Sequence, residues 1–476
     1  MSPKDLSHLL SEESKGRLPS ALKSAFKYYG QPDLVFLGGG LPMADYFPWD
    51  KIVAYSPAPP FADGIGAKPT HDENTTVTEL VKHQVEEYDV PLARSLQYGY
   101  TQGQPELLNF IKEHTELIHK LPYEEWDAII SVGNTQSWEA VLRTFVNKKE
   151  SILVEEYTFS SAIETARALD VNFVPVPMDA FGIIPEKLDE LLDNWDESKQ
   201  GKKPKLLYTI ATGQNPTGSS LSNERRVEIY KTACKHDFII VEDEPYYFLQ
   251  MEPYTKESSE PAKQTHEEFL GALVKSFLHI DTEGRVIRLD SFSKVLAPGT
   301  RLGWIVAQKT ILERFVRLHE VSIQTASGFT QSIVSGLLGR WGQSGYIDWL
   351  IGLRKEYTIK RNVAMDTLEK FFPKQVGSFE PPIAGMFFTV NLDASKHPKF
   401  ATKYDSDPIK VETAVYEKSL EKGCLMIPGS WFRSPHFDSK GSTEFFFRGT
   451  YAAVPLDALA LGIERFCQAV IAEYEL

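Results

Sequence analysis

Short runs of apolar residues alternate with longer amphipathic stretches from about residue 125 onward. These runs are DAIISVGNT, SILVEEY, KLLYTI, DFIIVEDE and RVIRLDSFS, and polar or glycine residues end or closely follow each of them. After the first run, apolar residues recur with the spacing of one helical face at Trp138, Val141, Leu142 and Phe145. Strands that alternate with helices are typical of βαβ units, so the pattern predicts an α/β fold with a mainly parallel central sheet flanked by helices.

The pattern changes toward the C-terminus. From about residue 345 the helical stretches lengthen, and two strand-like segments, GMFFTVNL and EFFFRGTY, precede an amphipathic helix predicted over 456–474. We therefore expect an N-terminal arm over 1–50, a large domain over 51–340 and a smaller α+β domain over 341–476. Loops are expected at 55–72 and at three polar stretches, 193–205, 256–268 and 395–408.

Length and composition narrow the class of protein. The chain has 476 residues, enough for two domains, with 42% hydrophobic residues. It carries 51 Lys and Arg against 65 Asp and Glu, a net charge of −14, which argues against a nucleic-acid or anionic-membrane surface. The three cysteines lack CxxC spacing, and none of the eleven histidines joins a metal-ligand cluster, so no disulfide framework and no metal are expected. No apolar run suits a membrane span or a signal peptide, and a cytoplasmic location is expected.

Polar residues follow several predicted strands, where ligands bind in open parallel sheets. An amide follows KLLYTI, a carboxylate and a phenol end or follow DFIIVEDE, and hydroxyls, an amine and a guanidinium follow RVIRLDSFS. These are Asn215, Asp243, Tyr246, Ser291, Ser293, Lys294 and Arg301. The segment Gly133–Thr135 begins a helix, whose N-terminus binds anions. This combination of groups is what pyridoxal 5'-phosphate (PLP) requires.

Each group has a chemical role in such a site. A lysine forms a Schiff base with PLP and acts as general acid and base, which suits Lys294. Asp243 would keep the pyridine nitrogen protonated, while Asn215 and Tyr246 would donate to the phenolate O3′. The phosphate would be held by hydroxyls, a guanidinium and the helix start, namely Ser291, Ser293, Arg301, Asn134 and Thr135.

Five segments make the chain recognisable: SFSKVLAPGTRLGW, GQNPTG, EDEPYYFLQ, PIAGMFF and FFFRGTYAA. They resemble the PLP-dependent aminotransferases of fold type I, and more narrowly the fungal aromatic-amino-acid aminotransferases of the kynurenine and 2-aminoadipate aminotransferase group. The resemblance runs from GGGLP at 38–42 through LQYGYTQGQPELL at 96–108 to the C-terminal helix. It implies that the large domain binds PLP and that the arm contributes to the small domain and covers the active site.

The resemblance also implies further site residues. Tyr98 would reach the cofactor phosphate of a neighbouring subunit in a homodimer with shared active sites and would border the substrate. Arg448 and Asn215 would bind the substrate, Arg448 through the α-carboxylate. Gly39, Gly40 and Leu41 would line the substrate pocket. Phe159 would stack on the cofactor, where kynurenine-type relatives have a tyrosine.

The implied reaction moves an amino group between an aromatic L-amino acid (Phe, Tyr or Trp) and 2-oxoglutarate by a ping-pong mechanism. One alternative is a dedicated 2-aminoadipate or kynurenine aminotransferase, because the chemistry at the α-carbon is the same. A PLP-dependent lyase or decarboxylase also stays open on the cofactor residues alone. A PLP-binding regulatory module is disfavoured, because residues 1–50 lack the basic face of a DNA-binding domain.

Overall fold

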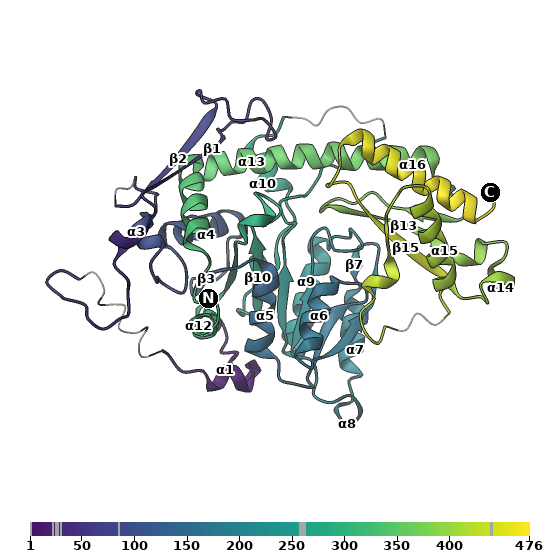
Figure 1. Cartoon of the computed structure of the whole chain (residues 1–476). Coiled ribbons are helices and arrows are strands. Elements are labelled where there is room, and N and C mark those ends of the chain that lie inside the picture. The colour runs from purple at the N-terminus through teal and green to yellow at the C-terminus, as the bar shows by residue number, and fades with distance from the viewer. Residues whose placement is uncertain are drawn as a thin grey trace. The chain divides into compact units, whose positions relative to one another are not determined.

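The structure is a computed structural model that describes residues 2–20, 23, 28, 31–83, 86–256, 263–437 and 441–476 (Figure 1). Contacts within the chain define two compact units. The first comprises Met1–Glu150, Ala233–Pro245 and His266–Gly352, and the second comprises Ser151–Thr232, Tyr246–Thr265 and Leu353–Leu476.

Four strands of the first unit lie side by side in the order β3 (Trp126–Ser131), β11 (Gly303–Gln308), β10 (Val286–Ser291) and β9 (Ile239–Asp243). Strands β9 and β10 are parallel, whereas β11 runs antiparallel to both β10 and β3. All residues of β9, β10 and β11 are buried. The register pairs Leu289 with Asp243, so the polar ends of β9 and β10 lie next to each other.

Helices α4 (Pro105–His119), α5 (Asn134–Phe145) and α12 (Lys309–His319) pack on this sheet. The predicted apolar face of α5 is buried at all four positions. Shorter helices are α1 (Glu12–Gly16), α3 (Leu92–Ser95), α10 (His266–Ala272) and α11 (Phe277–Ile280), with 3-10 turns η1 (Ser7–Leu9), η3 (Ala44–Tyr46) and η4 (Pro298–Thr300). The start of the arm belongs to this unit, because Leu6, Leu9 and Leu10 are buried and Arg314 donates to the Ser14 carbonyl oxygen.

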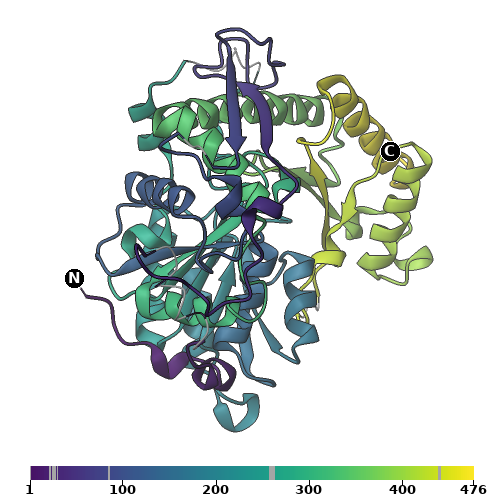
Figure 2. The same ribbon diagram turned by 60° about the vertical axis from the view of Figure 1, so that its left-hand side comes forward.

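A hairpin of β1 (Lys51–Pro57) and β2 (Thr75–Val81) lies beside α13 (Gly328–Phe371) in both ribbon views (Figures 1 and 2). The Trp341 indole N–H donates to the Pro57 carbonyl oxygen at 3.1 Å and joins the two. Helix α13 is interrupted at Gly342, which has a φ of +62°.

The second unit contains parallel strands in the order β8 (Leu206–Thr209), β4 (Ser151–Glu155) and β5 (Asn172–Val176). Helices α6 (Ser160–Ala168), α7 (Pro185–Asp193) and α8 (Glu197–Gln200) follow in the chain, with a short β6 (Met178–Asp179) and β7 (Gly182–Ile183) pair between them. Helix α9 (Asn223–His236) begins in this unit.

An antiparallel sheet in the same unit has the order β12 (Gly377–Phe379), β13 (Phe387–Asp393), β15 (Glu444–Thr450) and β14 (Ile427–Pro428). Helices α14 (Phe400–Lys403), α15 (Pro408–Glu421) and α16 (Leu456–Glu473) and turns η5 (Ala394–Lys396) and η6 (Gly429–Phe432) accompany it. Phe388, Val415, Phe447 and Phe466 belong to its buried core, so this part has the α+β character that the sequence predicts.

The predicted strands and the last helix are present. The loop expected at 55–72 starts after β1 ends at Pro57. The long helix expected from about residue 345 corresponds to the part of α13 that follows the break at Gly342. Of the stretch 256–268, residues 257–262 lie outside the described residues, and α10 begins at His266. The domain limits 1–50, 51–340 and 341–476 stay a prediction. In the part of the chain that the structure describes, no helix is both long and apolar enough to cross a membrane.

Candidate active site

The turn after β10 carries the predicted amine and hydroxyls of the first unit. The Ser291 hydroxyl donates to the Ser293 hydroxyl at 2.8 Å and accepts the Ser293 backbone N–H at 3.0 Å. Lys294 is half-buried, and burial together with the nearby charge of Arg301 lowers the pKa of its amine. A lowered pKa increases the neutral fraction of an amine, which is the nucleophilic form.

The predicted carboxylate lies at the end of the neighbouring strand. Asp243 is 6% exposed, and its Oδ1 accepts a hydrogen bond from Asn134 Nδ2 at 2.6 Å. Asn134 Nδ2 also donates to the Leu289 carbonyl oxygen at 2.9 Å, which fixes the amide between β10 and the carboxylate. Asn134 is predicted at the phosphate through the backbone N–H groups of the turn at 133–135, and its backbone N–H does belong to the first turn of α5. Its side chain in addition contacts Asp243, and its role at the phosphate stays a prediction.

The start of α5 forms a candidate anion site. The first N–H groups of a helix, here those of Asn134 and Thr135, have no acceptor within it. The Arg301 guanidinium lies beside this turn, donating to the Val132 carbonyl oxygen at 3.1 Å and to Ser293 Oγ at 3.4 Å. Gly133 has a φ of +88°, and a Cβ there would lie 2.6 Å from an Arg301 nitrogen, so glycine permits this approach.

These residues of the first unit fit PLP. A helix start, two hydroxyls and a guanidinium suit its phosphate, and a buried carboxylate suits its pyridine nitrogen. A half-buried amine suits its aldehyde. In addition, the Oδ1 atom of Asn134 is buried and has no hydrogen-bond partner among the described residues, as expected next to a site for a polar ligand.

The second unit brings Asn215, Tyr246 and Arg448 together. Arg448 on β15 donates to Asn215 Oδ1 at 2.7 Å. Its guanidinium carbon lies 4.4 Å from the ring centroid of Phe387 and 4.5 Å from that of Phe432. Burial lowers the pKa of Arg448, and the nearby Tyr246 acts in the opposite direction. An arginine held between two aromatic faces keeps its charge and its orientation, and both suit a carboxylate ligand.

The other predicted residues lie as follows. Phe159 is half-buried directly before α6. Gly39 and Leu41 are half-buried and Gly40 is exposed, while Tyr98 is 55% exposed in the loop before α4. Among the described residues of the first unit, no hydrogen bond, ion pair or ring contact joins Lys294 to Tyr98 or to the segment 39–41.

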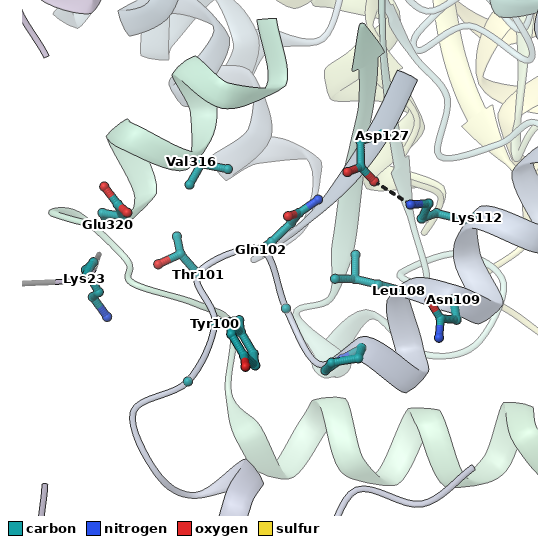
Figure 3. A pocket seen from close by; sticks show the side chains of 13 residues that line it. Lys23, Tyr100, Thr101, Gln102, Leu108, Asn109, Lys112, Asp127, Val316 and Glu320 are labelled. Atoms are coloured by element: carbon teal, nitrogen blue, oxygen red, sulfur yellow. Dashed lines mark ion pairs between the residues drawn. The ribbon is translucent and has the colours of Figure 1, made fainter. Parts of the chain in front are cut away.

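The residues that follow Tyr98 in the same loop line a cavity of about 410 Å³ (Figure 3). Tyr100, Thr101 and Gln102 border it together with residues of α4 and the end of α12, and an ion pair of Lys112 with Asp127 at 3.0 Å lies on one side. None of the predicted site residues lines this cavity.

Several residues near Arg448 in the second unit are not predicted from the sequence. Phe387 stood within a recognised segment without a role, and neither Phe432 nor the pair of Glu155 and Gln214 was singled out. The one signal for this pair is a glutamate at the end of an apolar strand. A charged side chain at such a position is either exposed to solvent or hydrogen-bonded to several partners.

Comparison with known proteins identifies the family. The class I and II aminotransferases match residues 64–466. The chain belongs to this family. It is 42% identical to an aromatic amino acid aminotransferase of Schizosaccharomyces pombe over 98% of this chain and 97% of that protein. It is 35% identical to an L-tyrosine:2-oxoglutarate aminotransferase of Tapinella panuoides, over 92% of this chain and 89% of the other.

Among solved structures, the aminotransferase Aro8 from Candida albicans is 61% identical with a TM-score of 0.95, covering 100% of both chains. The prediction of a PLP-dependent aminotransferase of fold type I is therefore confirmed, as are the α/β fold class and the cofactor. The roles of the individual site residues stay predictions.

Proposed function

We propose that this aminotransferase moves the amino group of phenylalanine, tyrosine or tryptophan to 2-oxoglutarate by a ping-pong mechanism. The similarity over nearly the full chain to enzymes that are named for aromatic amino acids and for 2-oxoglutarate supports the proposal. The observation that carries it is Arg448, a half-buried guanidinium between two aromatic rings, because both substrates present an α-carboxylate.

PLP, when bound, supplies the electron sink that lets the α-carbon release its proton. Lys294 would hold the cofactor, and its amine, whose pKa is lowered, would serve as the base and acid at the α-carbon. Asp243, which accepts a hydrogen bond from Asn134, would keep the pyridine nitrogen protonated. In the second unit, Asn215 and Tyr246 would donate to the phenolate oxygen, and Phe159 would pack on the ring.

The phosphate is bound by Ser291, Ser293, Arg301 and the backbone N–H groups of Asn134 and Thr135. Arg448, with Asn215, binds the α-carboxylate of the amino acid and then that of the oxo acid. Gly39, Gly40 and Leu41 line the side-chain pocket. In this scheme residues 51–340 form the cofactor domain, 341–476 form the small domain, and the arm over 1–50 contributes to the small domain and covers the site.

The enzyme acts as a homodimer in which Tyr98 binds the phosphate of the partner's cofactor and borders its substrate. Large apolar and aromatic side chains of the arm and its hairpin are exposed in the single chain, as expected of a surface that another subunit covers: Val35, Leu37, Met43, Tyr46, Trp49 and Tyr55. The enzyme works in the cytoplasm, where its three thiols stay reduced.

Subunit exchange tests this arrangement. Tyr98→Phe subunits mixed with Lys294→Ala subunits form one site with an intact lysine and an intact tyrosine from the partner. PLP affinity at that site returns to the level of the unmodified enzyme if Tyr98 acts across the interface. Affinity that stays at the Tyr98→Phe level after verified exchange contradicts the shared site.

A substrate panel tests the reaction itself. Purified enzyme is mixed with 2-oxoglutarate and one amino acid at a time, and glutamate formation gives kcat/KM for each. We expect the highest values for the three aromatic amino acids. A higher value for 2-aminoadipate or kynurenine would assign the alternative substrate, and release of CO₂ or ammonia without glutamate would indicate a decarboxylase or lyase.

A further inference from the structure

Glu155, the last residue of β4, is a buried carboxylate that accepts hydrogen bonds from four groups. Glu155 as a whole is only 2% exposed. Oε1 accepts from the Thr209 hydroxyl at 2.7 Å and from the Ile210 backbone N–H at 3.2 Å. Oε2 accepts from Gln214 Nε2 at 2.8 Å and from the Thr158 hydroxyl at 3.3 Å. The carboxylate therefore joins the ends of β4 and β8 to the turn that precedes Asn215.

Gln214 extends this connection and can adopt one orientation only. Its Nε2 also donates to the Tyr157 carbonyl oxygen at 2.6 Å. Its Oε1 accepts the backbone N–H of Thr217 at 2.8 Å and the Thr217 hydroxyl at 2.7 Å. Because a backbone N–H only donates, Oε1 must face Thr217 and Nε2 must face Glu155. The turn around Asn215 is thus held on both sides by one side chain.

Two routes of direct contact lead from Glu155 to Arg448. Along the first, Gln214 precedes Asn215, whose Oδ1 accepts from Arg448. Along the second, Thr158 donates its backbone N–H to the Phe432 carbonyl oxygen at 3.0 Å, and the Phe432 ring lies on the Arg448 guanidinium. Two of the three groups that contact Arg448, Asn215 and Phe432, therefore depend on segments fixed by one carboxylate.

Burying a charged carboxylate at this position costs free energy, so packing alone does not explain a glutamate here. Burial raises the pKa of Glu155 to about 7, although its four hydrogen bonds act in the opposite direction. An amide of the same shape has one acceptor oxygen instead of two. Its NH₂ group would face either the Ile210 N–H or Gln214 Nε2, and both are donors. Only a carboxylate satisfies both sides of the site.

We propose that Glu155 is a positioning residue for the substrate α-carboxylate, because its buried carboxylate fixes the turn of Asn215 and the segment of Phe432 that together orient Arg448. The inference rests on the proposed role of Arg448. Since the amino acid and the oxo acid use the same guanidinium in turn, a displaced Arg448 weakens binding of both, while Lys294 and Asp243 of the first unit are left unchanged.

The test is Glu155→Gln in the PLP-loaded enzyme, with Glu156→Gln as the matched control. Glu156 is the next residue, is half-buried, and its side chain accepts from the Met178 N–H, away from Gln214. We expect the KM values of both substrates to rise about ten-fold in Glu155→Gln, the weight of one hydrogen bond to a charged group. The Ki of 3-phenylpropionate, which has the carboxylate and ring but no amino group, rises equally. The control stays within about two-fold.

The kcat and the visible absorbance of the bound cofactor distinguish positioning from general damage, and both are expected to stay close to those of the unmodified enzyme. If Glu155→Gln does not fold, Gln214→Leu breaks the same link from the other side and is expected to raise the same constants. Unchanged KM and Ki values, or a loss confined to kcat, would overturn the proposal.

Arg448→Gln is measured in parallel to separate the two hypotheses. If this variant binds both carboxylates normally, the proposed role of Arg448 is wrong. If it weakens binding of both while Glu155→Gln does not, the role of Arg448 stands and the positioning role of Glu155 is wrong.

Discussion

Replacing Gly133 with alanine tests the phosphate site through the backbone. Gly133 precedes α5 with φ +88° and ψ +168°, a region that is essentially restricted to glycine. A Cβ built on this residue lies 2.6 Å from one Arg301 nitrogen and 3.3 Å from the guanidinium carbon. The guanidinium is the end of a long side chain and can move, so alanine pushes Arg301 away from the start of α5 and also strains the turn.

The magnitude follows from these two effects. A non-glycine residue in this region of φ and ψ costs about 1–3 kcal/mol. A displaced Arg301 loses its hydrogen bonds to the charged phosphate, and one such bond contributes about 1.5–3 kcal/mol. We therefore expect PLP to bind about 10- to 100-fold more weakly to Gly133→Ala, with a smaller loss of kcat when PLP is saturating.

The assay is a titration of the apoenzyme with PLP, followed by fluorescence and by the thermal shift that PLP produces. Gly271→Ala is the matched control, because Gly271 lies in α10 and a Cβ there meets nothing within 4 Å. An unchanged Kd for Gly133→Ala, or an equal loss in Gly271→Ala, would refute the assignment of the α5 start and Arg301 to the phosphate.

Three further predictions concern the amine and the two carboxylates. Lys294→Ala should abolish turnover and the visible absorbance of the lysine-bound cofactor in a spectrum of the purified enzyme; retention of both would show that another amine acts. Asp243→Asn should keep the fold but reduce kcat by about 10²- to 10³-fold in steady-state assays, because a preorganised charge is lost; near-normal kcat would point to a different carboxylate. The raised pKa of Glu155 means that between about pH 5 and pH 7 the folded chain keeps a proton that the unfolded chain has released, so this group's contribution to stability falls as the pH rises. Urea unfolding should show the unmodified enzyme losing about 2 kcal/mol relative to Glu155→Gln over this range, whereas parallel curves would contradict the buried charge.

The strands of the central sheet could be predicted only in part. Apolar runs marked β9 and β10 and the polar residues at their ends, so Asp243 and Lys294 were found by their place after a strand. Strand β11 was not separated, because its apolar run follows the lysine segment after a short connection, and apolar content does not reveal that a strand runs antiparallel. The part of α13 before the break at Gly342 is not predicted separately, because its first turns, GFTQSIVSG, contain few apolar residues.

The position of Asn134 shows a second limit. A polar residue at a helix start can bind an anion through its backbone N–H or a neighbouring group through its side chain, and the sequence is the same in both cases. The choice depends on Asp243, which is 109 residues away and meets Asn134 only because β9, β10 and α5 pack together. A local pattern therefore finds the residue and leaves its partner undetermined.

Glu155 is a residue whose role no local sequence pattern identifies. The residues that do chemistry follow strands and stand in recognisable segments, whereas the groups that orient them are recognised by what they contact. Glu155 precedes Asn215 by sixty residues and Arg448 by nearly three hundred, and it meets donors from β8, from the turn at Gln214 and from its own strand end. Because four donors converge on a site that water does not reach, a carboxylate there costs free energy unless all four stay in place. The need to keep all four hydrogen bonds in place makes the turn of Asn215 rigid. A rigid turn keeps the Arg448 guanidinium in one orientation while it binds two different carboxylates in succession.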